Sequence, residues 1–128
     1  NISCLKTRIV QIQNVAKGQS IGYDRAEIVN KNTKIAVIPI GYADGLNRKL
    51  SNGRGMVRIN NTYAPIVGKI CMDLTMVDIT NIDADEGDEV IIFDNKYPIT
   101  KIAKILETIP YEILTSIPSR VKRVYVWE

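Results

Sequence analysis

The stretch Ile38-Pro39-Ile40-Gly41-Tyr42-Ala43-Asp44-Gly45 is the most informative part of this chain. An apolar strand runs into a glycine-containing turn, and polar groups follow at the strand's end. A second stretch of the same design is Pro65-Ile66-Val67-Gly68-Lys69-Ile70-Cys71-Met72-Asp73. A packed strand fixes the position of such a turn while the loop stays open to ligand. Both stretches are therefore candidate sites of chemistry on a strand-rich fold.

The residues around these stretches alternate in polarity or form short apolar runs, which is typical of strands. We expect strands at 5–13, 20–23, 35–40, 56–59, 63–70, 76–79, 89–93 and 121–127. Residues 24–33 and 46–55 are polar and indicate loops. Asn60-Asn61 between two strands indicates a hairpin, because Asn tolerates positive φ. Pro39 inside an apolar run favours an edge strand or a bulge.

Near the C-terminus the apolar period changes to that of a helix. Ile99, Ile102, Ala103 and Leu106 have helical spacing, and residues 111–115 predict a second short helix after Pro110. The 128 residues suffice for one domain. We therefore expect a mainly β fold, a partly open or closed β-barrel of short strands with one or two short helices near the C-terminus, because a barrel removes exposed strand edges.

The composition excludes several classes of function. The chain has no histidine, which rules out Ser-His-Asp or Cys-His catalysis and any His-ligated metal site within it. The net charge is only +3, and the basic cluster Arg120, Lys122 and Arg123 is typical of a solvated strand face, so no nucleic-acid partner is expected. No apolar run is long enough to cross a membrane. Two distant cysteines and no secretory signal indicate the cytoplasm, and no metal site is expected.

Three places carry residues suited to chemistry, each with a plain structural alternative. Tyr23 is either a packed strand-end tyrosine or an acid/base whose pKa a nearby cation lowers. Tyr42 and Arg48 lie on one loop, either as turn and surface residues or as a gate for a carboxylate substrate. The Met72-Asp73 segment either forms a bulge or turn, or directs a backbone N–H at a ligand anion.

Taken together and in order, these segments resemble the C-terminal domain of the pyridoxal-phosphate-dependent alanine racemases. The resemblance covers nearly the whole chain, and it is the co-occurrence of the motifs that is specific. The matching pieces are Gly22-Tyr23, Gly41-Tyr42, Asp44-Gly45, Arg48, Val67-Gly68-Lys69, Met72-Asp73, Gly87-Asp88-Glu89-Val90, Tyr111-Glu112 and Arg120-Val121-Lys122-Arg123.

The resemblance implies a role for each residue. Tyr23 would be the acid/base on the substrate face opposite a cofactor lysine, and Met72, beside Asp73, would offer its backbone N–H to the substrate carboxylate. Tyr42, Arg48 and Lys69 would line the access corridor. The family pairs such a domain with an N-terminal (β/α)8 barrel that binds pyridoxal 5'-phosphate, and this barrel is expected to lie outside residues 1–128. The implied substrate is a small-molecule amino acid, and the implied assembly is a homodimer.

Two positions depart from the family pattern. Lys69 stands where many members have arginine, which keeps the charge but not the bidentate fork. Ser119 stands where many members carry a tyrosine near the cofactor phosphate, so the cofactor pocket would be larger. A serine-preferring racemase is therefore one alternative. A non-catalytic β-barrel that serves binding or dimerisation is another.

Overall fold

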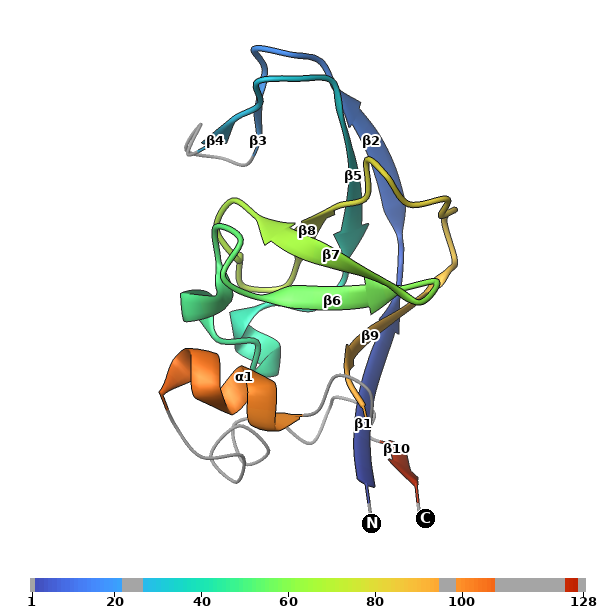
Figure 1. The fold of residues 1–128 in the computed structure, drawn as a ribbon, viewed down its shortest axis with the longest axis vertical. Coiled ribbons are helices and arrows are strands. Elements are labelled where there is room, and N and C mark those ends of the chain that lie inside the picture. The colour runs from blue at the N-terminus through green and yellow to red at the C-terminus, as the bar shows by residue number, and fades with distance from the viewer. Residues whose placement is uncertain (1, 22–26, 95–98, 108–123, 127–128) are drawn as a thin grey trace.

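The computed structural model describes residues 2–21, 27–94, 99–107 and 124–126 (Figure 1). In chain order its elements are β1 (Ile2–Arg8), β2 (Gln11–Val15), β3 (Ser20–Ile21), β4 (Glu27–Ile28), β5 (Thr33–Ile38), the 3₁₀ helices η1 (Tyr42–Asp44) and η2 (Arg48–Leu50), β6 (Met56–Ile59), β7 (Thr62–Val67), β8 (Thr75–Asp78), β9 (Glu89–Phe93), α1 (Ile99–Leu106) and β10 (Val124–Val126).

Eight strands form one antiparallel sheet in the order β10-β1-β9-β6-β7-β8-β5-β2, and β3 and β4 form a separate two-stranded hairpin. Strand β2 follows β1 along the chain, yet β1 pairs with β9 while β2 pairs with β5. The continuous stretch β1–β2 therefore pairs near both ends of the strand order, so the sheet must curl to bring its two ends together. This confirms the predicted mainly β fold with a partly open or closed barrel.

The expected strand over residues 5–13 is in fact two strands separated by a bend. The Ile9 N–H donates to the Asp88 carbonyl, whereas the next residue, Val10, donates to the Val37 carbonyl. Gln11 is also opposite Val37, so two residues of this strand face one residue of β5. Such a bulge bends and twists a strand. The bend transfers the chain from one half of the curled sheet to the other.

Several local predictions are confirmed. Asn60 and Asn61 have φ values of 49° and 62° and connect β6 to β7, as a hairpin turn with positive φ at both central residues requires. The expected strand at 89–93 and the expected helix at 99–106 occur with those bounds. The second helix predicted at 111–115 and the start of the last predicted strand lie outside the described residues.

Two local predictions are wrong. The segment 24–33 is expected to be a loop, yet Glu27–Ile28 form β4 and Thr33 begins β5, because these residues pair with β3 and β2 despite the polar composition. Pro39 is neither on an edge strand nor in a bulge. Strand β5 is central, between β2 and β8, and ends at Ile38, so Pro39 follows it and removes no ladder hydrogen bond.

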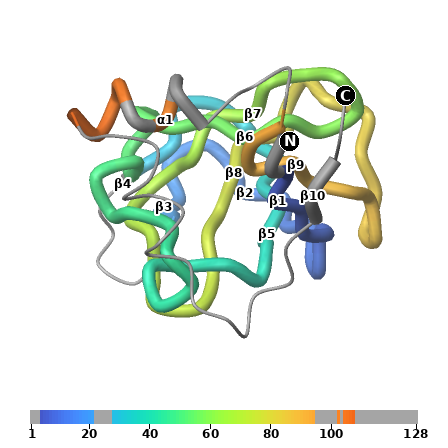
Figure 2. The backbone as a smooth tube through the Cα atoms, turned by 90° about the horizontal axis from the view of Figure 1, so that it is seen from below, coloured from blue at the N-terminus to red at the C-terminus, as the bar shows by residue number. Residues whose placement is uncertain are grey.

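The core fills the curled sheet. Val57 and Ile59 of β6 alternate with outward residues, and their neighbours Ala64 and Ile66 of β7 are equally buried. Helix α1 covers one end of this core beside η2, with Ile102 buried (Figures 1 and 2). Among the described residues, no helix has the length and apolar character needed to cross a membrane.

A smaller cluster secures the β3–β4 hairpin. Ile21 of the hairpin and Val29 just after it pack with Ile35 of β5 and Val67 of β7. The hairpin projects beyond the main sheet in Figure 1, so this cluster is its apolar attachment to the barrel. Its position matters for the site, because Val67 directly precedes the second motif's glycine.

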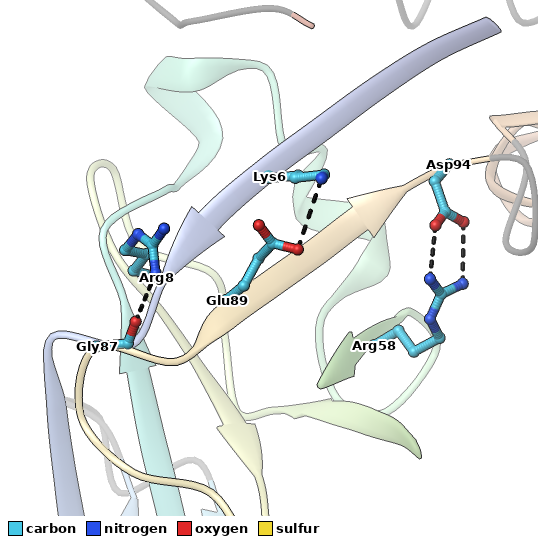
Figure 3. A network of polar contacts seen from close by, with 6 residues as sticks. All are labelled: Lys6, Arg8, Arg58, Gly87, Glu89 and Asp94. Carbon is cyan, nitrogen blue, oxygen red and sulfur yellow. Dashed lines mark hydrogen bonds and ion pairs between the residues drawn. The ribbon is translucent and has the colours of Figure 1, made fainter. Parts of the chain in front are cut away.

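Polar contacts tie β1, β9 and β6 together on their outer side (Figure 3). Arg58 forms a bidentate ion pair with Asp94, with N–O distances of 3.0 and 2.6 Å, and the two side chains are only 8% and 12% exposed. The hydrogen bond to Asp94 raises the pKa of Arg58. The Lys6–Glu89 pair, at 3.6 Å, is far more exposed. Of the two ion pairs, the buried Arg58–Asp94 pair is therefore the one that matters for the stability of the fold.

Candidate functional site

The two sequence motifs, some thirty residues apart along the chain, lie directly against each other. The Tyr42 N–H donates to the Cys71 carbonyl at 3.0 Å, and the Ala43 N–H donates to the Met72 carbonyl at 2.9 Å. Two consecutive carbonyls of the second motif are thus held by two consecutive amides of the first. The pairing fixes how the peptide units of residues 71–72 are oriented.

Gly41 permits this contact because it has no side chain. A Cβ atom at Gly41 would lie 2.2 Å from the Cys71 carbonyl oxygen and 2.5 Å from that of Met72. Its φ of −146° is an extended value that any residue adopts, so space and not backbone conformation requires glycine here. The first motif therefore has glycine at this position because the backbone of the second motif leaves no room for a side chain.

Met72 and Asp73 form the tip of a tight turn. The Cys71 N–H donates to the Leu74 carbonyl at 3.1 Å, which closes the turn around them. Within the described part of the chain, the N–H groups of Met72 and Asp73 have no hydrogen-bond acceptor. The Met72 side chain is 56% exposed, and Asp73 is also exposed. Two outward amides without an acceptor are suited to an anionic group.

The residues expected to line an access corridor are all exposed. The Arg48 guanidinium lies over the Tyr42 ring, 5.3 Å from its centroid, and both side chains are exposed. Such a cation–π contact favours one orientation of two otherwise mobile side chains. Lys69 is exposed and follows Gly68, whose φ is 63°. The structure thus joins Tyr42 to the turn through its N–H, places Arg48 over the Tyr42 ring, and leaves Lys69 exposed three residues before Met72.

Three buried polar side chains support the two motifs, and the sequence interpretation missed their role. Asp44 Oδ2 accepts a hydrogen bond from the Gly41 N–H at 3.0 Å. Ser51 Oγ accepts from the Ile70 N–H at 2.9 Å, and Thr75 Oγ1 donates to the Ile40 carbonyl at 2.6 Å. The Asp44-Gly45 turn was visible in the sequence, but no sequence signal singles out Ser51.

Two of the predicted site residues, Tyr23 and Ser119, lie outside the described residues. The nearest described residue before Tyr23 is Ile21. Its Cγ2 atom would lie 3.8 Å from a Cβ built on Gly68. The end of β3 therefore adjoins the strand end from which the Met72-Asp73 turn extends.

In the part of the chain that the structure describes, the cysteines and acidic residues form no second candidate site. Cys4 and Cys71 are both free thiols. Burial raises the pKa of the Cys4 thiol, which disfavours the reactive thiolate. Among the described residues, no group of three or more His, Cys, Asp or Glu side chains is placed to hold a metal ion.

The chain matches the family model described as "Alanine racemase, C-terminal domain" over residues 2–125. It is 47% identical to an alanine racemase of Helicobacter pylori (strain Shi470), over 98% of this chain and 34% of that protein. It is 46% identical to alanine racemase 2 of Caldanaerobacter subterraneus subsp. tengcongensis, over 95% of this chain and 32% of that protein. The chain thus spans about a third of the length of these relatives.

Solved structures agree with this match. An alanine racemase from Bartonella henselae, described with covalently bound pyridoxal phosphate, superimposes with a TM-score of 0.88 at 38% identity, over 94% of this chain and 34% of that one. An alanine racemase of Clostridium difficile 630 in complex with cycloserine superimposes with a TM-score of 0.85 at 41% identity, over 92% and 32%. The motifs, the curled sheet and these similarities lead to one conclusion: the chain belongs to the alanine racemase family and corresponds to the C-terminal domain of its members.

Proposed function

We propose that this chain supplies the substrate-carboxylate site and one acid/base group of an amino-acid racemase that interconverts L- and D-alanine with pyridoxal 5'-phosphate. The relatives are named alanine racemases, which does not favour the serine-preferring or the non-catalytic alternative. The observation that carries the proposal is the Met72-Asp73 turn, whose outward N–H groups have no acceptor among the described residues.

The Met72 N–H is suited to the substrate carboxylate because its direction is fixed before any ligand arrives. The carbonyls of Cys71 and Met72 are held by Tyr42 and Ala43, so the peptide units on both sides of Met72 are constrained. A preorganised amide loses little entropy when it binds a carboxylate, and a hydrogen bond to a charged group is stronger than one to a neutral group. The turn would therefore orient the amino acid by its carboxylate.

Tyr23 is the proposed acid/base group. Inversion of a stereocentre needs one group to remove the Cα proton and another, on the opposite face, to return it. Tyr23 follows Ile21 by two residues, which limits the distance between their Cα atoms to about 7 Å. The contact between Ile21 and Gly68 supports the proposal that Tyr23 serves the same site as the Met72-Asp73 turn. A cation from the rest of the enzyme would lower the tyrosine pKa toward neutral pH.

The donor set of this chain fits the substrate better than the cofactor. The two acceptor-free N–H groups of the Met72-Asp73 turn suit a small anion such as a carboxylate. When bound, pyridoxal phosphate supplies an electron sink for the carbanion left after the Cα proton is removed. We propose that the part of the enzyme beyond these residues holds most of the cofactor, with Ser119 near its phosphate.

Tyr42, Arg48 and Lys69 are proposed to line the path by which the amino acid reaches the turn. Arg48 and Lys69 carry positive charge on exposed side chains, which attracts a carboxylate. We also propose a homodimer, in which the exposed Met72 and Tyr42 of one subunit face the cofactor pocket of its partner. A cytoplasmic location stays a prediction from the sequence.

A chimera tests the proposal. Residues 1–128 replace the matching C-terminal third of the Helicobacter pylori relative, and racemisation of alanine is followed by circular dichroism. Met72→Pro removes the N–H and should raise the KM for alanine at least about tenfold, since hydrogen bonds to charged groups contribute about 1.5–3 kcal/mol. Met72→Leu keeps the N–H and is the matched control, with a KM within about twofold of the parent. Equal KM values for the two variants would show that the Met72 N–H does not bind substrate.

A further inference from the structure

Buried polar side chains are concentrated around the two motifs. Among the described residues, five polar or charged side chains are buried: Thr33, Asp44, Ser51, Arg58 and Thr75. Three of these five, Asp44, Ser51 and Thr75, bond to the backbone of residues 40–41 or 70. A buried polar group is costly unless it is hydrogen-bonded. Their shared location therefore suggests a common task at the motifs.

The three contacts hold the Met72-Asp73 turn from different directions. Ser51 Oγ accepts a hydrogen bond from the Ile70 N–H, in the segment between the end of β7 and the turn, two residues before Met72. Thr75 lies three residues after Met72, and its hydroxyl donates to the Ile40 carbonyl, so the outgoing strand is tied to the first motif.

Asp44 acts on the first motif itself. Its carboxylate receives the Gly41 N–H across the 3₁₀ turn η1. The following amides, those of Tyr42 and Ala43, are the ones that hold the carbonyls of Cys71 and Met72. Asp44 therefore helps to set the direction of the Tyr42 and Ala43 amides. These two amides in turn orient the peptide units on either side of Met72.

We propose that Asp44, Ser51 and Thr75 are positioning residues that aim the Met72 N–H at the substrate carboxylate. This inference rests on the proposed function. All three side chains are at most 8% exposed, so they act through the backbone and do not touch the substrate. Loss of one contact should leave the fold intact, because each turn keeps its remaining backbone hydrogen bonds. It should instead loosen the turn and weaken carboxylate binding.

Thr75→Val is the most direct test, because valine has the shape of threonine without its hydroxyl. Thr33→Val is a matched control. Thr33 is also a buried threonine, and its hydroxyl also donates to a backbone carbonyl, that of Lys31, but at the opposite end of β5 from the motifs. Each variant removes one hydroxyl–carbonyl hydrogen bond, which is buried for Thr75 and part-buried for Thr33, so Thr33→Val controls for the loss of such a bond away from the turn. Only Thr75→Val should alter the turn.

Three readouts in the chimera loaded with pyridoxal phosphate separate positioning from simple stability. Thr75→Val should raise the KM for alanine and the dissociation constant of acetate, a carboxylate probe, each about fivefold, with kcat within about twofold. Hydrogen exchange of the backbone amides in residues 68–74 should accelerate by a similar factor. Thr33→Val should change none of these, and Thr75→Ser, which restores the hydroxyl, should return all three toward the parent values.

The result that would overturn the proposal is equal behaviour of Thr75→Val and Thr33→Val in hydrogen exchange and acetate binding. Hydrogen exchange needs no racemase activity. If the chimera is inactive yet Thr75→Val still loosens residues 68–74 selectively, the proposed racemase function fails while the positioning contact stands. If the parent chimera is active and the two threonine variants are indistinguishable, the positioning role fails alone.

Discussion

Replacing Gly41 by alanine should separate the two motifs. The new Cβ would lie 2.2 Å from the Cys71 carbonyl oxygen, whereas ordinary contacts begin at 3.4 Å, so the backbones must move apart by about 1.2 Å. The hydrogen bonds of Tyr42 and Ala43, now 3.0 and 2.9 Å long, would then exceed bonding distance. Two lost hydrogen bonds at about 1 kcal/mol each, with about 1–3 kcal/mol of overpacking, predict a loss of about 3–5 kcal/mol in unfolding free energy.

Urea unfolding followed by far-ultraviolet circular dichroism measures this loss, with Gly18→Ala as the control. Gly18 has open space around it but a φ of 89°, so alanine there meets no atom and costs only the strain of a left-handed conformation, about 1–2 kcal/mol. At Gly41 the situation is the reverse, because the φ is one that alanine adopts freely but there is no space for its Cβ atom. If Gly41→Ala destabilises the protein no more than Gly18→Ala does, the close contact between the motifs is refuted.

Two further predictions concern groups outside the site. Arg58→Met should lower the free energy of unfolding, measured in urea, by about 3–5 kcal/mol, because it leaves the Asp94 carboxylate buried without its guanidinium partner. Adding Asp94→Leu should recover part of this loss. If the losses of the two single variants simply add in the double variant, the two residues are not a coupled pair. Hydrogen bonds from the Asp85 N–H and from Asn60 hold the pKa of Asp88 below its usual 3.8. The stabilisation that the ionised Asp88 gives the folded protein is therefore complete at pH values above the pKa of Asp88 in the unfolded state. It is lost as the pH falls through the pKa of Asp88 in the folded state. Asp88→Asn should accordingly lose less thermal stability than the parent between about pH 5 and pH 2, and parallel melting curves would disprove the assignment.

The parts of the fold that local chemistry determines were predictable from the sequence. Asn60-Asn61 indicated a hairpin because both residues tolerate positive φ, and the helical spacing of Ile99, Ile102 and Leu106 indicated α1. The bend at Ile9–Val10 was not predictable. No glycine or proline marks it, and it arises because Val10 bonds to Val37 of a strand that comes later in the chain. Strand β4 was missed for the same reason, since pairing with β3 decides it.

The site was predictable in part. Gly41, Tyr42, Met72 and Asp73 were singled out by their motifs, but their mutual contact depends on a backbone approach that no spacing in sequence encodes. The supporting contact of Ser51 was invisible for the same reason: a serine in a polar loop has no signature until its partner, the Ile70 N–H, is known. The roles of the site residues stay predictions.

The most direct test of the account is the fate of the Cα proton when Tyr23 becomes phenylalanine in the chimera. Removing one of two acid/base groups should lower the rate of alanine inversion by at least about 100-fold, the usual contribution of such a group. Exchange of the Cα proton with deuterated solvent should persist for one enantiomer only, because the base on the other face remains. An inversion rate equal to that of the parent, in a variant with the parent's melting temperature, would contradict the claim that this domain supplies the second proton-transfer group.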